Sequence, residues 1–274
     1  LFRLEQNYRS TKNIVNAANS LIKNNEIRLK KNVWTENEFG EKISLNKLLT
    51  DGEEGRFVAS SIFETKMQNQ LNNSDFAILY RTNAQSRSFE DSLRKKNIPY
   101  RVYGGLSFYQ RKEIKDVLAY LRLLINIDDE QAFKRIINFP ARGIGQTTLN
   151  KISIEAKKFN ISDYSYIKNH SKSSEILNNS TKNKLLDFIV MLESIKLKIK
   201  SLNVFEITKE VLKQSGLYSL YKNDESLEGI NRIQNIEELL NGIKDFIDND
   251  EEEDKTVSSF LQNVALVTDQ DNED

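Results

Sequence analysis

The sequence predicts an α/β part followed by an all-α part: a partial parallel sheet with covering helices over residues 1–107, then helices only over residues 108–274. Two observations predict this division. Up to the paired glycines Gly104 and Gly105, strand-like apolar runs alternate with helical patterns, which is typical of a parallel sheet covered by helices. Beyond Ser107, apolar residues recur only at the three- and four-residue spacing of helices.

The first part alternates short extended segments with capped helical patterns. The strands expected there are residues 2–6, 42–49, 75–82 and 100–103. Residues 75–82 are the most apolar of these and are expected to be buried. Helices are expected after Ser10 or Thr11, in residues following the capping segment 50–55, and between residue 83 and Pro99, because polar caps precede amphipathic patterns at these places.

The second part carries long helical repeats of apolar residues. The clearest run over residues 114–125, 185–195 and 233–247. Residues 249–255 are acidic and predict an exposed loop, and residues 269–274 predict a frayed end.

Composition excludes several kinds of site. The chain has no Cys, which excludes disulfides, thiolate-bound zinc and a thiol nucleophile, and which fits a cytoplasmic protein. His170 is the single histidine, so neither a multi-histidine metal site nor a Ser-His-Asp triad is expected. No apolar run reaches the roughly 18–20 residues that span a bilayer. The chain starts with Leu1 instead of Met, so we expect a fragment of a longer protein.

The charge is balanced overall but unevenly distributed. Residues 245–274 hold eleven acidic residues and one lysine, a net charge of −10, which leaves +10 on residues 1–244. A basic body favours a polyanionic partner. The alternative is an ordinary solvated surface with an acidic loop and tail.

Two arginines follow expected strands and precede helices. Ligands of open parallel sheets bind at the carboxyl ends of the strands, where Arg9 and Arg81 are expected. A guanidinium donates two hydrogen bonds at once, which suits a phosphate. Asn83 can present its amide to a base or sugar, or it can cap the next helix. The alternative is that both arginines are surface residues.

Residues 141–148 form a second candidate. Gly143 and Gly145 flank Ile144 just before a helical pattern, so a tight turn can present backbone amides to an anion while Ile144 anchors the turn. Further donors for a phosphate chain are Arg142, Thr147 and Thr148. The alternative is an ordinary turn between helices.

Residues 104–116 form a third candidate, in which Phe108 or Tyr109 stacks on a base and nearby basic residues contact phosphate. Packing of these aromatic residues into a junction is the favoured alternative for Phe108. No G-x-x-x-x-G-K-[ST] sequence occurs, so this chain alone is not expected to hydrolyse ATP.

Four long blocks of sequence together resemble the UvrD/PcrA/Rep-type superfamily 1 DNA helicases. They are LEQNYRST (4–11), AILYRTNAQSR (77–87), YRVYGGLSFYQRKEIKDVLAYLRLL (100–124) and IINFPARGIGQTTLNKI (136–152). The resemblance implies that residues 1–107 begin the second RecA-like motor domain (2A, the UvrD-like helicase C-terminal region). Residues 108–274 would be the helical accessory domain (2B) inserted into it.

The resemblance also implies roles for individual residues. Arg9 matches an arginine that contacts the γ-phosphate of ATP, and Tyr8 a tyrosine near the nucleotide base. Arg81 and Asn83 match residues that contact single-stranded DNA. The residues matching a loop that holds duplex DNA are Arg142, Gly143, Ile144, Gly145, Thr147 and Thr148.

The activity implied is that of a bacterial, cytoplasmic and nucleoid-associated ATP-dependent 3′–5′ DNA helicase of repair or replication. ATP and Mg²⁺ would bind to the complete enzyme, and this part alone would bind no cofactor or metal. We expect a monomer that meets the junction of single-stranded and duplex DNA, and repair or replication proteins as further partners. The alternatives are a stand-alone duplex-binding module and a regulatory, partner-binding domain.

Overall fold

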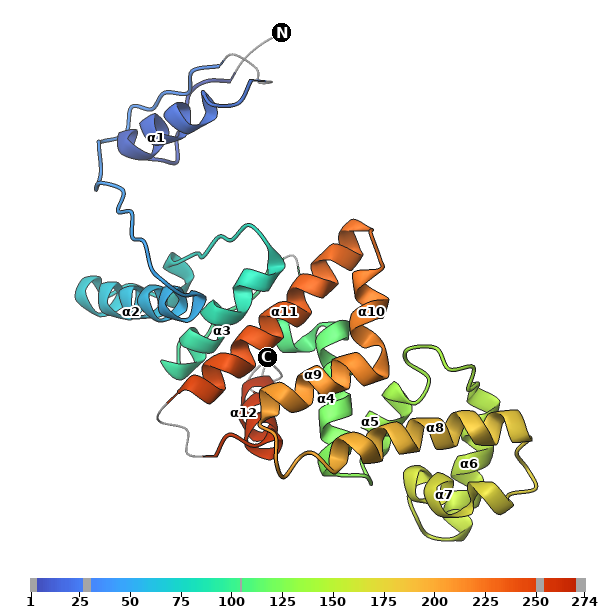
Figure 1. The fold of residues 1–274 in the computed structure, drawn as a ribbon. Coiled ribbons are helices and arrows are strands. Elements are labelled where there is room, and N and C mark those ends of the chain that lie inside the picture. The colour runs from blue at the N-terminus through green and yellow to red at the C-terminus, as the bar shows by residue number, and fades with distance from the viewer. Residues whose placement is uncertain (1–3, 27–30, 104, 250–253, 270–274) are drawn as a thin grey trace. The chain divides into compact units, whose positions relative to one another are not determined.

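The computed structural model describes residues 4–26, 31–103, 105–249 and 254–269, with side chains up to residue 265. Figure 1 shows the course of the chain. The α-helices of these residues are α1 Lys12–Ile22, α2 Asp51–Asn69, α3 Ser86–Lys95, α4 Lys112–Ile125, α5 Glu130–Ile136, α6 Gln146–Lys158, α7 Asp163–His170, α8 Asn179–Lys196, α9 Val204–Ser215, α10 Leu217–Lys222, α11 Leu227–Asp248 and α12 Val257–Asp269. Short 3₁₀ helices are η1 Asn73–Asp75, η2 Asn83–Gln85, η3 Phe108–Gln110 and η4 Ser171–Ser173.

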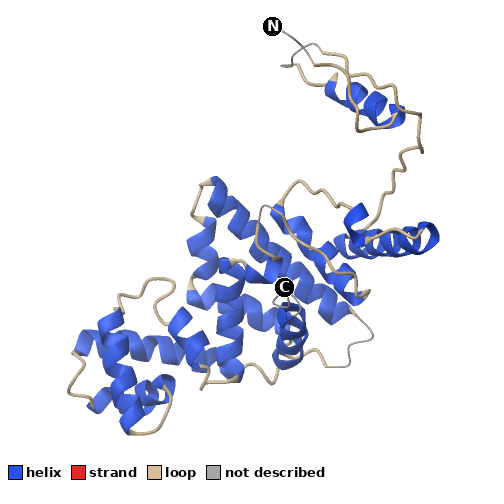
Figure 2. Ribbon diagram, turned by 180° about the vertical axis from the view of Figure 1, so that it is seen from behind, coloured by secondary structure: helices blue, strands red, loops and turns tan. Residues whose placement is uncertain are grey.

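The predicted parallel sheet is wrong. Among the described residues the only β-pairing is an isolated parallel bridge between Gln6 and Trp34, and Figure 2 shows helices joined by loops. The predicted strand at 75–82 begins in η1 and then runs extended without a partner, and Leu79 is 94% exposed instead of buried. An apolar pattern makes extended backbone favourable, but a strand also needs a neighbouring strand to bind its N–H and C=O groups.

The predicted helices are confirmed. α1 follows Thr11, and α2 follows Thr50, whose Oγ1 accepts a hydrogen bond from the Glu53 amide at 3.1 Å. α3 lies between residue 83 and Pro99, as predicted. Helices are predictable from a short stretch of sequence, because their backbone hydrogen bonds close within a few residues.

Residues 108–264 share one apolar core. α4 lies at its centre and packs against α5, α8, α9, α11 and α12, and accordingly it is buried on almost all sides. The all-helical prediction for this half is confirmed. Of the predicted acidic loop and frayed end, residues 250–253 and 270–274 lie outside the described residues.

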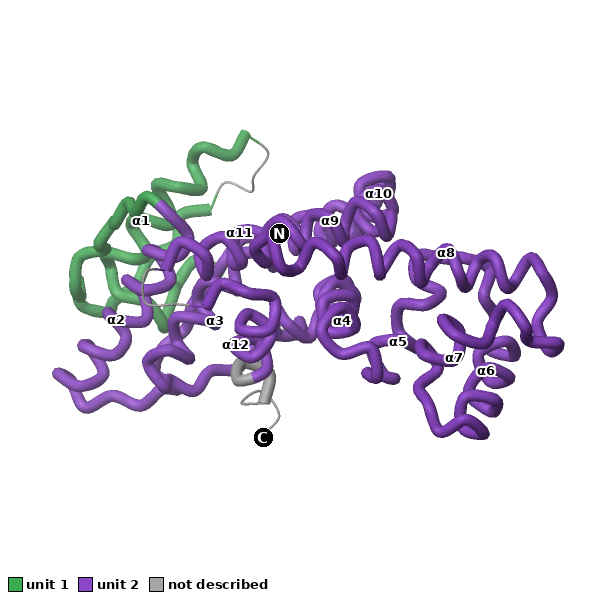
Figure 3. Tube along the Cα trace, turned by 60° about the horizontal axis from the view of Figure 1, so that its bottom comes forward, with its two compact units in different colours: residues 1–49 green, residues 50–274 purple. Residues whose placement is uncertain are grey.

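The chain divides into two compact units, residues 1–49 and 50–274 (Figure 3). In the first, the Gln6–Trp34 bridge lies beside α1, and the Asn19 side chain ties α1 to Val33 through two hydrogen bonds of 2.7 and 3.2 Å. In the second, α2 and α3 pack together and α3 also contacts α11. Each candidate residue can therefore be placed within its own unit.

Candidate nucleic-acid interface

Tyr8 and Arg9 lie in a turn that leads into α1. The Asn7 side chain accepts hydrogen bonds from the backbone amides of Arg9 at 2.9 Å and Ser10 at 2.7 Å. Tyr8 is 80% exposed and donates to Gln6 at 2.8 Å. The Arg9 guanidinium is exposed and has no hydrogen bond or ion pair with the described residues. The turn therefore presents a cation that can accept an anionic ligand.

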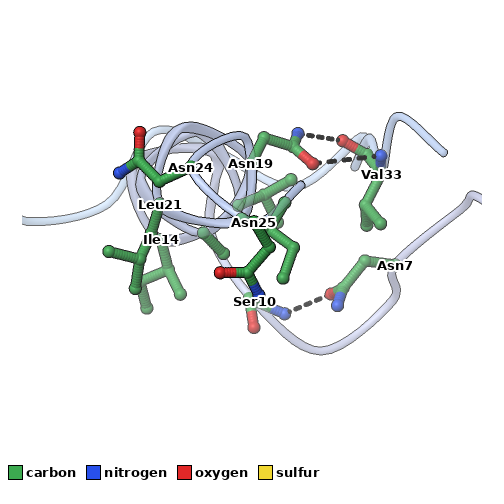
Figure 4. A pocket seen from close by; sticks show the side chains of 11 residues that line it. Asn7, Ser10, Ile14, Asn19, Leu21, Asn24, Asn25 and Val33 are labelled. Atoms are coloured by element: carbon green, nitrogen blue, oxygen red, sulfur yellow. Dashed lines mark hydrogen bonds between the residues drawn. The ribbon is translucent and has the colours of Figure 1, made fainter. Parts of the chain in front are cut away.

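A hollow of about 660 Å³ opens beside this turn. Figure 4 shows Asn7 and Ser10 on one side of it and α1 on the other. Its apolar lining includes Ile14, Leu21 and Val33. Its polar groups are mainly asparagine amides, so the hollow itself carries no charge that would select a phosphate.

Arg81 and Asn83 lie at η2, immediately before α3. The Gln85 side chain accepts hydrogen bonds from the backbone amides of Arg81 at 2.9 Å and Thr82 at 3.0 Å. Both Arg81 and Asn83 are exposed, and neither side chain binds another described residue. Gln85, which the sequence analysis did not single out, fixes the backbone that carries them.

The loop before α6 is built around one side chain. Asn138 Oδ1 accepts hydrogen bonds from the backbone amides of Arg142 at 2.9 Å and Ile144 at 3.1 Å. Gly143 has φ +69°, a conformation that favours glycine. Ile144 is 1% exposed and packs into the core, so it anchors the turn as predicted.

The outer side of this loop is open to solvent. Gly143, Gly145 and Thr147 are exposed, and Thr148 is half-buried. Gly145 precedes α6, whose first N–H groups have no carbonyl of the helix to bind. These amides and the positive end of the helix dipole suit an anion.

The Arg142 side chain points the other way. Its Nη1 donates to the carbonyls of Ile136, Ile137 and Pro140 at 2.9–3.2 Å, and its Nη2 donates to the Tyr120 hydroxyl at 2.7 Å. The guanidinium also lies 5.0 Å from the centre of the Phe188 ring. Arg142 was predicted to be a phosphate donor, but in the structure its N–H groups are engaged inside the protein.

Lys184 of α8 lies beside Gly143. A Cβ atom added to Gly143 would lie 2.7 Å from its Nζ. Lys184 is exposed and has no ion pair or hydrogen bond with the described residues. No local pattern in the sequence points to Lys184, because only the packing of α8 brings it to a loop some forty residues earlier.

In the third candidate segment the aromatic residues are buried, whereas Lys112 and Lys115 are exposed. Phe108 is fully buried with Tyr109 edge-on to it at 5.2 Å, and Arg111 lies 5.1 Å from the Phe108 ring. The packing alternative for Phe108 is therefore confirmed. Arg111 is also buried and binds inside the protein, so it does not face a ligand in solution.

Other kinds of site find no support in the described chain. Its histidine and acidic side chains form no group of three that could hold a metal ion. None of its described helices combines the length and the apolarity needed to cross a membrane.

Comparison with known proteins gives a consistent result. The family described as UvrD-like helicase C-terminal domain matches residues 2–274. The ATP-dependent DNA helicase PcrA of Bacillus subtilis is 43% identical over 270 residues, which cover 98% of this chain and 36% of the relative. DNA helicase II of Haemophilus influenzae is 40% identical over 265 residues, covering 96% and 36%. The chain thus spans about a third of the length of these relatives.

Proposed function

Because the chain belongs to the UvrD-like helicase family, we propose that it is part of an ATP-dependent DNA helicase that moves 3′ to 5′ and separates duplex DNA in repair or replication. The match over residues 2–274 carries this proposal. Residues 1–107 would belong to the second motor domain and residues 108–274 to its inserted accessory domain.

Tyr8 and Arg9 would form one side of the ATP site. The Arg9 guanidinium has no partner among the described residues, which leaves its donors for the γ-phosphate, where they would offset charge in the transition state. This chain has no phosphate-binding G-x-x-x-x-G-K-[ST] sequence. The rest of the ATP site and its Mg²⁺ would therefore be held by other parts of the complete enzyme.

DNA would contact the second unit at two places. Arg81 and Asn83, both exposed on the backbone that Gln85 holds, would contact the single strand. The loop would bind the duplex backbone through the amides of the exposed residues Gly143 and Gly145, because the Ile144 amide already donates to Asn138. Thr147 and Thr148 would add hydroxyl donors.

Arg142 would act on the duplex indirectly. Its inward hydrogen bonds hold the end of α5 and the loop together, so we propose a positioning role in place of a phosphate contact. Lys184, instead of Arg142, would supply the positive charge that contacts a phosphate. Its ammonium stands beside Gly143, on the side of the loop that is open to solvent.

Binding of a labelled duplex with a 3′ single-stranded tail, followed by fluorescence anisotropy over a range of salt, tests the duplex contact. Each phosphate contact adds about 0.9 to the slope of log K against log salt for B-DNA. Lys184→Gln should reduce the slope by about that amount. The matched control is Lys200→Gln, an exposed lysine beyond the far end of α8, roughly 20 Å away along the helix.

Gly143→Val is a second arm of this test. A β-branched residue is strained at φ +69° and would also meet Lys184, so it should weaken duplex binding in a chain that remains helical by circular dichroism. Native duplex affinity in both variants would refute the duplex contact. Failure of the unaltered chain to bind DNA at low salt would favour the regulatory or partner-binding alternative.

A further inference from the structure

Arg87, near the start of α3, is bound to α11 by a network of charges in which Arg87 and Glu238 are buried and Asp245 is exposed. It is 4% exposed, and its Nε donates to Glu238 at 2.6 Å while its Nη2 donates to Asp245 at 3.1 Å. Both carboxylates belong to α11. The third nitrogen, Nη1, donates to Asp91 of α3 itself at 3.1 Å. One guanidinium thus joins two helices that are far apart in the sequence but pack together in the second unit (Figure 1).

A second buried arginine makes a parallel connection. Arg111, just before α4, donates to Asn235 of α11 at 2.9 Å and to the Ser86 hydroxyl at 2.8 Å. Asn235 in turn donates to Glu113 at 2.5 Å, and Ser86 donates to Glu90 at 2.6 Å. All residues of this second connection are buried, so each of their polar groups needs a hydrogen-bond partner within the protein.

Both connections begin directly after the segment that carries the proposed single-strand contacts. Ser86 and Arg87 follow η2, and η2 itself contacts α11. The Gln85 side chain accepts hydrogen bonds from the amides of residues 81 and 82. Of the two residues that follow Gln85, Ser86 accepts a hydrogen bond from Arg111 and Arg87 donates one to Glu238 of α11. The backbone that carries Arg81 and Asn83 therefore continues directly into residues that are bound to α11 and to Arg111.

The charged network is expected to fix the arrangement of α3 and α11 more than to raise the free energy of unfolding. Burial lowers the pKa of Arg87, but Asp91 and Glu238 outweigh this and raise it above the ordinary value, so the guanidinium stays charged. For Glu238, burial raises the pKa despite the attraction of Arg87. Buried ion pairs of this kind often contribute little net stability, and they constrain the arrangement of the groups around them.

Glycine on α11 makes the close approach of Arg87 possible. A Cβ atom added to Gly242 would lie 2.8 Å from Arg87 Nη1 and 3.0 Å from Cζ. The guanidinium therefore lies directly on the backbone of α11. Gly242→Ala would displace it while leaving every charge in place.

We propose that Arg87 and Glu238 are positioning residues for single-strand binding: they hold the segment that carries Arg81 and Asn83 against α11, and the single-strand contact fails when that attachment is loosened. The proposal rests on the proposed function, in which these two residues contact single-stranded DNA. It extends that function by making α11, which lies in the second half of the chain, part of the single-strand site.

The main test replaces the charged pair by apolar residues of similar size, Arg87→Met with Glu238→Leu. Such replacements are often neutral or stabilising, so the thermal midpoint should be unchanged within a few degrees. Affinity for a labelled single strand should nevertheless fall by roughly threefold to tenfold, the range expected for a network that orders its neighbours. Affinity for blunt duplex DNA should not change.

Gly242→Ala is the second variant, and it should also weaken single-strand binding. A matched control removes an exposed ion pair of the same charge from α6, Glu155→Gln with Lys158→Gln, whose carboxylate and ammonium are 2.8 Å apart. The control should leave the affinity for single strands unchanged. A double-mutant cycle adds a further criterion: Arg81→Gln should have less effect in the apolar double variant than in the unaltered chain, because both act on one contact.

The outcomes separate the two proposals. If Arg81→Gln weakens single-strand binding but the folded apolar variant and Gly242→Ala both bind normally, the positioning proposal is overturned. If the apolar variant does not fold, Gly242→Ala decides the matter alone. If Arg81→Gln itself has no effect, the single-strand contact of the proposed function is what fails.

Discussion

The extended segments before residue 107 and the helices after it differ in how far their apolar side chains are buried. Residues 108–264 share one core in which side chains such as Ile114, Phe133 and Ile243 are almost fully buried. In residues 4–49, by contrast, Val15 is the one described apolar side chain that is buried, and Leu45 is 97% exposed. Helices bind their own backbone and then need only neighbouring helices, whereas extended segments need partners for both backbone and side chains.

The largest contrast should appear in hydrogen exchange. The amides of residues 77–80 bind no described acceptor, whereas those of α4 are bonded within a buried helix. We expect the central amides of α4 to exchange at least roughly 10³-fold more slowly, because they open only with the whole core. Exchange measured by mass spectrometry over overlapping peptides tests this. Equal protection of the two segments would contradict the comparison.

A pair of substitutions tests the same contrast in stability. Phe133→Ala removes a ring that packs edge-on to Phe188 at 6.3 Å and should lower the free energy of unfolding by about 3–5 kcal/mol. Leu45→Ala removes an exposed side chain and should change it by less than about 0.5 kcal/mol. Urea unfolding followed by circular dichroism measures both. Similar losses would mean that Leu45 is covered in solution.

A pH-dependent contribution is expected inside the helical part. Glu193 accepts hydrogen bonds from Tyr164 at 2.6 Å and Lys168 at 2.9 Å. Burial raises the pKa of Glu193, but these two bonds outweigh it, so its pKa lies below the ordinary value of 4.5. A depressed carboxyl pKa stabilises the fold above the ordinary value, and this stabilisation is lost as the pH falls through the folded-state pKa.

Glu193→Gln should therefore be less stable than the unaltered chain at neutral pH, by under about 1 kcal/mol for so exposed a pair. The difference should close as the pH falls through the folded-state pKa of Glu193, which lies below 4.5. Urea unfolding at a series of pH values gives both numbers. A difference that stays constant across this range would show that the charge of Glu193 is not what stabilises the fold.

The smallest expected effect is that of removing residues 1–49. The core of residues 108–264 draws on no side chain from that unit, so residues 50–274 should keep their helical content and a thermal midpoint within about 3 °C. Circular dichroism on heating measures this. A large drop would show that the first unit stabilises the second.

The residues of the candidate nucleic-acid interface differ in how well the sequence predicts their positions. The turn with Gly143 and the anchoring of Ile144 follow from a glycine pattern within three residues, and both are found. The inward direction of the Arg142 side chain was not predictable, because its Nη2 donates to the Tyr120 hydroxyl and the Ser215 carbonyl, which lie 22 and 73 residues away in the sequence. Lys184 and the Arg87–Glu238 pair could not be found either, since their partners lie far away in the sequence.

The helices and the glycine turn are predictable from sequence, because each depends on hydrogen bonds and apolar spacing within a few residues. The resemblance to helicases is likewise carried by long blocks in a consistent order. Packing, in contrast, sets which strand-like segments pair, where Arg142 points, and which charges meet α11. Those outcomes depend on contacts between distant residues, for which a local pattern supplies one half of the pair and packing supplies the other.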